Sequence, residues 1–213
     1  HWQRAWLQGE ALEQQLDYWR RHLAGAPTLL ELPTDHPRPA MQSYRGAGLA
    51  FRLDANLRQD LQALCAKQGV TLFMSLLAAF KVLLHRYSGQ TNIVVGTPIA
   101  NRTLLEIEPL IGMFVNTLAL HSSLNGAMRF TDFLTQVRDL TQAAYDHQDV
   151  PFEMLVEALR PVRSLSHTPL FQVVFVLQNN PQPDLVLPNL QLRWQAPPTT
   201  TTKFDLTLSL TES

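Results

Sequence analysis

One segment, residues 72–87, is apolar around most of its circumference, and this constrains the fold more than any other feature of the sequence. Thr71 is placed to cap the segment as a helix. A helix that is apolar on nearly every side must lie at the centre of a fold rather than on its surface. The next segment, 92–99, is a continuous apolar run of strand length, which predicts a buried strand beside that helix.

The same alternation of helix and strand patterns continues along the chain, with no internal repeat. A proline-dense stretch, 27–39, predicts an extended surface connector without regular structure. Interleaved elements favour an α/β (α+β) fold in which helices pack on one mixed β-sheet. The further predicted helices cover 10–23, 54–67, 130–144 and a segment starting at Pro151, and the further predicted strands cover 44–53, 111–121, 170–179, 190–194 and 204–210.

Charge and cysteine content exclude several classes of protein. The net charge of −1 gives no electrostatic basis for binding nucleic acid or an anionic membrane. The longest apolar run, 70–84, is too short and too interrupted by polar residues to span a bilayer. The polar residues 1–4 predict no signal peptide. The single cysteine, Cys65, excludes an intrachain disulfide framework, so we expect a cytoplasmic protein in which Cys65 is a buried helical side chain.

Common catalytic and metal-binding motifs are missing from the sequence. It has no glycine-rich phosphate loop, no Gly-x-Ser-x-Gly nucleophile elbow and no histidine or cysteine spacing typical of a metal site, so we expect no bound metal. The best cluster is His147-Gln148-Asp149, where a histidine beside a carboxylate could act as a general base. The same three residues are also typical of a capped loop between two helices.

Asn116 is an unusual residue in the stretch 111–121. If this stretch is a strand, both of its faces are mainly apolar, which predicts a strand covered on both sides. Burial of an amide without a partner costs about 1–3 kcal/mol. Asn116 must therefore either bond a neighbouring loop or serve a function, and its spacing alone leaves both alternatives open.

Three stretches, 111–117, 147–153 and 166–172, resemble the fifth, sixth and seventh core motifs of condensation domains of nonribosomal peptide synthetases, in the order of that family. The stretches 2–9, 32–38, 95–102 and 203–206 also match the family, so the resemblance covers nearly the whole chain. The sequence differs at two positions: His121 stands where the fifth motif commonly ends in Arg, and Ser164 stands where the seventh usually has Asp.

The resemblance implies one lobe of a chloramphenicol acetyltransferase-like fold, in which two lobes enclose a tunnel. Carrier proteins present a donor thioester and an acceptor aminoacyl thioester on 4'-phosphopantetheine, and an amide bond forms between them. The family's catalytic signature, His-His-x-x-x-Asp-Gly, is absent here, so we expect no catalytic residue and no bound cofactor in this chain. We expect residues 1–213 to be the C-terminal lobe, inactive alone. Because strand 204–210 would end as an unpaired edge, we also expect the lobe to be truncated at its C-terminal end.

The resemblance also implies roles for single residues. Asn116, His147 and Gln148 would line or position substrates in the tunnel, although the resemblance favours a structural, loop-capping role for 147–149 over tunnel lining. Arg45 would pair with the signature aspartate across the lobe interface, or else be a solvated arginine at a strand end. Structural roles would fall to Gly112, Asp149, Pro151 and Glu153.

The partners implied are the N-terminal lobe, carrier domains and an adjacent adenylation domain. Two alternatives remain. The chain could be a non-catalytic module that docks carrier or adenylation domains, or a lobe of a related acyltransferase.

Overall fold

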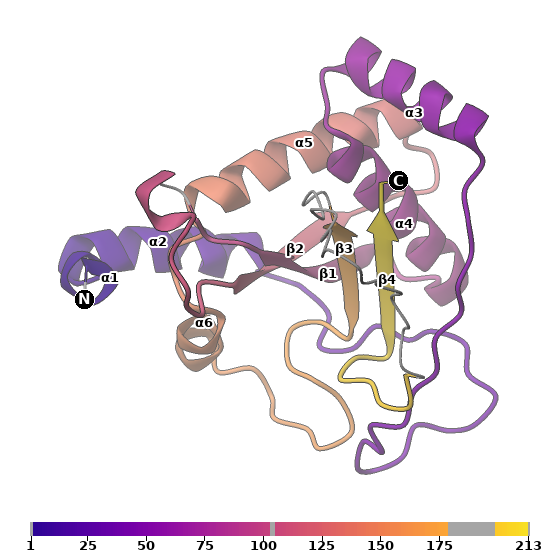
Figure 1. Cartoon of the computed structure of the whole chain (residues 1–213). Coiled ribbons are helices and arrows are strands. Elements are labelled where there is room, and N and C mark those ends of the chain that lie inside the picture. The colour runs from indigo at the N-terminus through magenta and orange to yellow at the C-terminus, as the bar shows by residue number, and fades with distance from the viewer. Residues whose placement is uncertain (1, 103–104, 179–198, 213) are drawn as a thin grey trace, which may run out of the picture.

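A four-stranded mixed sheet organises the chain, with the strand order β2-β1-β3-β4. The computed structural model describes residues 2–102, 105–178 and 199–212. β1 (Asn92–Ile99) pairs antiparallel with β2 (Asn116–Ser123) and parallel with β3 (Val173–Gln178), and β3 pairs parallel with β4 (Leu206–Thr211). The predicted class, a mixed sheet packed with helices, is confirmed (Figure 1).

Helices pack on this sheet and around its β2 end (Figure 1). α4 (Leu72–Ser88) contacts β1 and α5 (Phe130–Asp146), which in turn contacts β2. α6 (Phe152–Leu159) contacts β2 and α2 (Gly9–His22), which follows the short α1 (Trp2–Trp6). α3 (Ala55–Gln68) packs on α4, and the 3-10 helix η1 (Leu105–Ile107) lies in the β1–β2 connection.

The predicted helix signals are confirmed at α3 and α4. The Asp54 carboxylate accepts a hydrogen bond from the Asn56 N–H, and the Thr71 hydroxyl accepts one from the Met74 N–H. Gly69 ends α3 with φ +62°, a left-handed conformation that glycine adopts without a steric penalty. α4 is the central helix, with Leu77 and Ala78 fully buried, and Cys65 is a buried helical side chain as predicted.

Two predicted strands are wrong in part or in whole. In 44–53 only Arg45 forms a bridge, to Thr201, and the side chain of Leu49 is 91% exposed. In 111–121 the strand begins only at Asn116, and Ile111 is fully exposed. An alternating or apolar pattern shows that a stretch can form a strand, but pairing needs a neighbouring strand, and neither 47–53 nor 111–115 has one among the described residues.

Smaller differences occur at three other predicted elements. β3 begins at Val173 rather than at residue 170, because Leu170 has φ +66° and lies in a tight turn closed by the Phe171 N–H on the Pro169 carbonyl. Pro151 precedes α6 as its N-cap and is not its first helical residue. The predicted strand 190–194 lies outside the described residues.

Within the described parts of the chain, no single helix is long and apolar enough to cross a membrane. α3 and α4 together reach the required length and composition, but they meet at a bend of 104°.

Candidate functional site

The side-chain amide of Asn116 forms all of its hydrogen bonds with backbone groups. Its Nδ2 donates to the carbonyls of Gln148 and Val150, each at 2.8 Å. Its Oδ1 accepts from the N–H of Thr117 at 2.8 Å and from the N–H of Phe152 at 3.0 Å. The amide has two donor hydrogens and two acceptor lone pairs, so its capacity is filled. Of the two alternatives for this residue, a bond to a neighbouring loop is the one found, and a direct contact with substrate stays a prediction.

The loop that Asn116 holds, residues 146–150, starts at the last residue of α5 and leads to α6, and every one of its backbone carbonyls is bound by a side-chain N–H. Asn116 binds two of the five, and side chains of α1 and α2 bind the others. Because a helix leaves its last carbonyls without partners, such donors are needed where α5 ends. The loop is thus fixed from three elements, by Gln15 Nε2 on the Asp146 carbonyl (3.2 Å), Trp19 Nε1 on His147 (2.8 Å), Gln3 Nε2 on Asp149 (3.1 Å) and Asn116 on Gln148 and Val150.

His147 and Gln148 are held by α5 as well. The Nδ1 of His147 lies 2.8 Å from the Ala143 carbonyl, which can only accept, so Nδ1 carries a hydrogen. The ring stacks on Tyr18 with centroids 4.0 Å apart. Gln148 Nε2 donates to the Tyr145 carbonyl at 2.8 Å. The substrate-lining roles of both residues remain predictions.

The remaining predicted residues are only partly brought to this loop. Asp149 is half-buried, burial raises the pKa of its carboxyl, and none of the described side chains bonds to it. Glu153 is exposed in the first turn of α6, next to Pro151 and the loop. Gly112 lies in the exposed connection before β2, where a Cβ would meet the Phe114 ring at 3.0 Å. Arg45 is exposed and forms no ion pair with the described part of the chain, so its predicted salt bridge is untested.

Several residues that fix the site were not predicted. Gln3, Gln15 and Trp19 were not recognised as donors, because a helical pattern identifies which face is apolar and not which side chain reaches a distant carbonyl.

Gln172, which is 2% exposed, clamps another loop: its Oε1 accepts from the Leu30 N–H at 2.8 Å, and its Nε2 donates to the Thr168 carbonyl at 2.8 Å. A polar residue within an apolar run was a usable signal, as it was for Asn116.

A buried group of basic side chains lies near β2. Lys81 is fully buried, with its Nζ 2.8 Å from the Leu120 carbonyl and 2.5 Å from the Ser122 hydroxyl, and burial lowers its pKa to about 7. His22 Nε2 accepts from the His121 N–H at 3.0 Å, and burial lowers the pKa of His22 to about 4. The His121 ring bonds the His22 carbonyl at 2.9 Å, so the residue that departs from the family pattern has a local partner.

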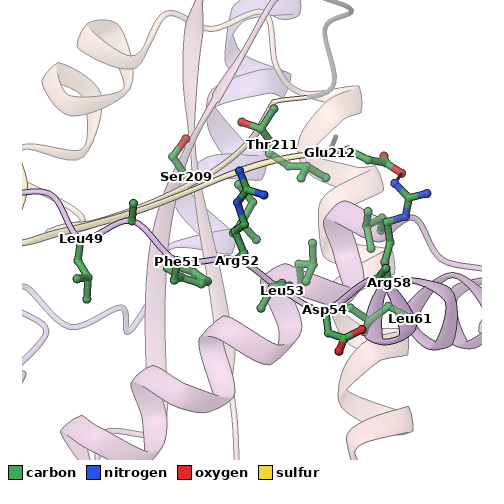
Figure 2. A pocket seen from close by; sticks show the side chains of 16 residues that line it. Leu49, Phe51, Arg52, Leu53, Asp54, Arg58, Leu61, Ser209, Thr211 and Glu212 are labelled. Atoms are coloured by element: carbon green, nitrogen blue, oxygen red, sulfur yellow. Dashed lines mark ion pairs between the residues drawn. The ribbon is translucent and has the colours of Figure 1, made fainter. Parts of the chain in front are cut away.

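A cavity of about 630 Å³ lies apart from the clamped loop, between segment 49–53, α3 and the end of β4. Figure 2 shows Phe51, Arg52 and Leu53 beside Ser209 and Thr211, with Arg58 directed toward Glu212 at 4.0 Å. Residues of the 146–150 loop do not line it. Within the described ranges, no group of three or more His, Cys, Asp or Glu side chains is placed to hold a metal ion.

A family model described as "Condensation domain" matches residues 1–213. The chain belongs to the condensation-domain family. Condensation domains of synthetases catalyse amide-bond formation. The chain is 52% identical over 211 residues to malpinin synthetase of Mortierella alpina and 50% identical over 215 residues to a linear gramicidin synthase of Brevibacillus parabrevis. These alignments cover 99% and 100% of this chain but only 3% and 4% of the relatives.

A solved condensation-type structure has the same fold. The X-domain from teicoplanin biosynthesis superposes with a TM-score of 0.88 at 32% identity, over 100% of this chain and 49% of that one. The resemblance inferred from the three core motifs is therefore confirmed at the level of family and fold. The chain spans about half of this structural neighbour and a small fraction of the synthetases that it matches.

Proposed function

We propose that residues 1–213 form the C-terminal, substrate-positioning lobe of a peptide-forming condensation domain. The support is that this chain matches about half of the X-domain structure and lacks the family's His-His-x-x-x-Asp-Gly signature. The observation that carries the proposal is the loop clamp at Asn116, because it joins the fifth and sixth family motifs into one rigid unit. A rigid loop bearing His147, Gln148 and Asp149 suits a reaction that depends on placing two substrates.

In the proposed reaction, the acceptor amine attacks the donor thioester carbonyl. The new C–N bond forms as the C–S bond breaks, the amine gives up a proton, and the carrier thiol leaves with a proton. Much of the rate of such a reaction comes from holding the reacting groups in line, and effective molarities for oriented groups reach about 10⁵–10⁸ M. This chain would contribute tunnel wall and orientation, with the catalytic histidine supplied by the other lobe.

The proposed partners are the N-terminal lobe, carrier domains that deliver the 4'-phosphopantetheine-bound substrates, and a neighbouring adenylation domain. Arg45, exposed and without an ion pair in the described ranges, is available for the predicted interlobe salt bridge.

A two-part reconstitution tests the proposal. We expect this chain alone to form no amide from two loaded carriers, and we expect amide formation when the N-terminal lobe of the same synthetase is added. Amide formation by this chain alone, or none with both lobes while the intact domain is active, would contradict the assignment of roles.

A second candidate is a non-catalytic docking module, favoured by the exposed apolar side chains of the β1–β2 connection. Leu105, Ile111 and Met113 are 79–104% exposed there, an arrangement typical of surfaces that bind other proteins. The reconstitution separates the two candidates, because a docking module would bind its neighbours without restoring amide formation.

A further inference from the structure

We propose that Gln3, Gln15 and Trp19, on α1 and α2, are positioning residues of the condensation site that act through the 146–150 loop. This inference rests on the proposed function. The helices contribute three of the five donors that bind consecutive loop carbonyls, from positions 128 to 146 residues away in the sequence.

The loop does not define its own position. The first N–H groups after α5, those of His147 and Gln148, bond back to the Ala144 and Tyr145 carbonyls of α5, at 3.2 and 3.3 Å. The loop carbonyls are bound by side chains of other elements. The direction in which His147, Gln148 and Asp149 project therefore depends on where α1, α2 and β2 place their donors, in addition to the bonds of the His147 and Gln148 side chains to α5.

The helix donors and Asn116 bind different carbonyls along the loop. α2 binds the first two carbonyls, Asn116 the third, α1 the fourth and Asn116 the fifth. Asn116 alone therefore leaves the carbonyls of Asp146, His147 and Asp149 unfixed. These belong to the three residues of the loop with titratable side chains, so loss of a helix donor changes the orientation of those side chains first.

The helix donors are suited to fixing geometry. Trp19 is 1% exposed, so its indole has no freedom to follow a moving loop. Tyr18, the preceding residue, stacks on the His147 ring and sets the plane of that ring. All three donors are uncharged amide or indole groups, so their bonds persist across the working pH range. Supporting groups of this kind hold functional side chains within the tolerance that chemistry requires.

The test uses the complete condensation domain with donor and acceptor carriers loaded. Trp19→Phe keeps an aromatic ring but removes the N–H, and Gln15→Met and Gln3→Met keep the side-chain length but remove the donor. The matched control is Gln14→Met, because among the residues that the structure describes the Gln14 side chain bonds only to Glu10, on the exposed side of the same helix. Amide formation is measured as kcat and as KM for each carrier, and amide hydrogen exchange is followed over 146–152.

We expect kcat to fall between about 10-fold and 100-fold in the three donor variants, since a displacement of about 1 Å costs up to about 100-fold. KM for the carriers should stay within about twofold, and exchange over 146–152 should rise. The control should match wild type in all three measurements. A merely structural role would lower the folded fraction without changing kcat per folded molecule, and Gln15→Met, at a half-buried position, keeps the test valid if Trp19→Phe folds poorly.

Wild-type kcat in all three donor variants would overturn the inference, whether or not loop exchange rises, and would leave the proposed function standing. A wild-type domain that forms no amide would instead refute the proposed function and this inference with it.

Discussion

Two side-chain amides each hold a distant loop by its backbone. Asn116 holds 148–152, and Gln172 holds both its own turn and the connector at residues 28–30. Each amide both donates to carbonyls and accepts from an N–H, which a carboxylate or a hydrocarbon of the same shape cannot do. Replacing either amide with a carboxylate or a hydrocarbon side chain of the same shape should therefore destabilise the fold.

Asn116→Asp is expected to lower the free energy of unfolding by about 3 kcal/mol. The change removes two N–H donors and places a carboxylate oxygen against the Gln148 and Val150 carbonyls, and a buried group left without its partner costs about 1–3 kcal/mol. Urea denaturation followed by circular dichroism measures the change.

Asn125→Asp is the matched control for this prediction. Asn125 is exposed, and its Oδ1 accepts from the Ala127 N–H, a role that aspartate retains. We expect a change within about 0.5 kcal/mol. Equal effects of the two substitutions would mean that the Asn116 clamp contributes no stability.

Lys81 makes stability depend on pH. Its pKa is about 7 in the folded chain, and 10.5 is the ordinary value for lysine, which we take for the unfolded chain. Between these two pH values the unfolded chain therefore binds more protons than the folded chain. Unfolding free energy therefore rises with pH in this window, and the cost of burying the charge is full below pH 7.

Comparison of wild type with Lys81→Met isolates this effect. From pH 7 to 9, the unfolding free energy of wild type should rise relative to that of the variant by about 2 kcal/mol, since a full proton difference gives about 1.4 kcal/mol per pH unit. Lys67→Met, at an exposed position on α3, should change no slope. Parallel pH profiles for wild type and Lys81→Met would contradict the prediction.

At the scale of single residues, sequence pattern shows which side chains are unusual but not what they contact. The sequence correctly indicates that Asn116 needs a partner, yet three of its four partners lie 32–36 residues further along the chain. Lys81 interrupted an apolar run and Trp19 fitted an apolar stripe, and neither pattern indicates a hydrogen bond. The contacts of both residues depend on how α2, α4 and β2 pack together.

At the scale of elements, the close packing of β1 against the turn before β3 requires a glycine at position 96 of β1. Gly96 pairs with Ala119 on β2 and Val174 on β3, in the middle of the sheet. A Cβ added there would lie 2.2 Å from the Phe171 ring, which also contacts the rings of Phe152 and Phe204. The ring therefore packs directly on the β1 backbone.

Gly96→Ala should destabilise the chain by about 3 kcal/mol, because overpacking of a filled core costs about 1–3 kcal/mol. Phe171→Leu in the same chain should recover part of that loss, since it removes the ring that collides, and thermal and urea unfolding of the single and double variants measure the coupling. Gly126→Ala, with nothing within 4 Å of the added Cβ, should change stability by less than about 0.5 kcal/mol. Strict additivity of the Gly96 and Phe171 changes would contradict the packing explanation.

Helices were predicted more accurately than strands for a physical reason. Caps such as Asp54 and Thr71 and the terminating Gly69 act within one turn, so the sequence contains the whole interaction. A strand exists only with a partner. Segment 44–53 has an alternating pattern suited to a strand, but it forms only the bridge at Arg45, and the partner a strand needs is not encoded nearby.

At the scale of the whole molecule, the proline-rich connector and its continuation to residue 42 are held in place by residues that lie much further along the chain. Gln90 binds it at the Leu29 carbonyl and the Glu31 N–H, and Arg38 forms a two-bond ion pair with Asp205 just before β4. The prediction of an extended surface segment was correct, because proline excludes helix and central strand. Its attachment points, 59 to 167 residues away, could not be read from the sequence.

A double-mutant cycle over Arg38→Lys and Asp205→Asn is expected to give a coupling energy of about 1 kcal/mol that weakens in high salt. Arginine binds a carboxylate through two parallel bonds that lysine cannot copy, while partial exposure screens the pair. The pair Arg129 and Asp132, which is more exposed and lies three residues apart, should give a smaller coupling. If the coupling energy between Arg38 and Asp205 is no greater than that between Arg129 and Asp132, the connector is held by its other contacts.

The clamped loop also bears on how synthetases of this kind could be recombined. The donors on α1 and α2 and the acceptors at 146–150 come from opposite halves of this chain, so a junction placed in the connector after α2 would combine donors from one parent with a loop from another. A junction on the N-terminal side of α1 transfers donors and acceptors together. Chimeras of the second kind should keep the parental site geometry, whereas those of the first kind would inherit whatever mismatch exists between the two parents.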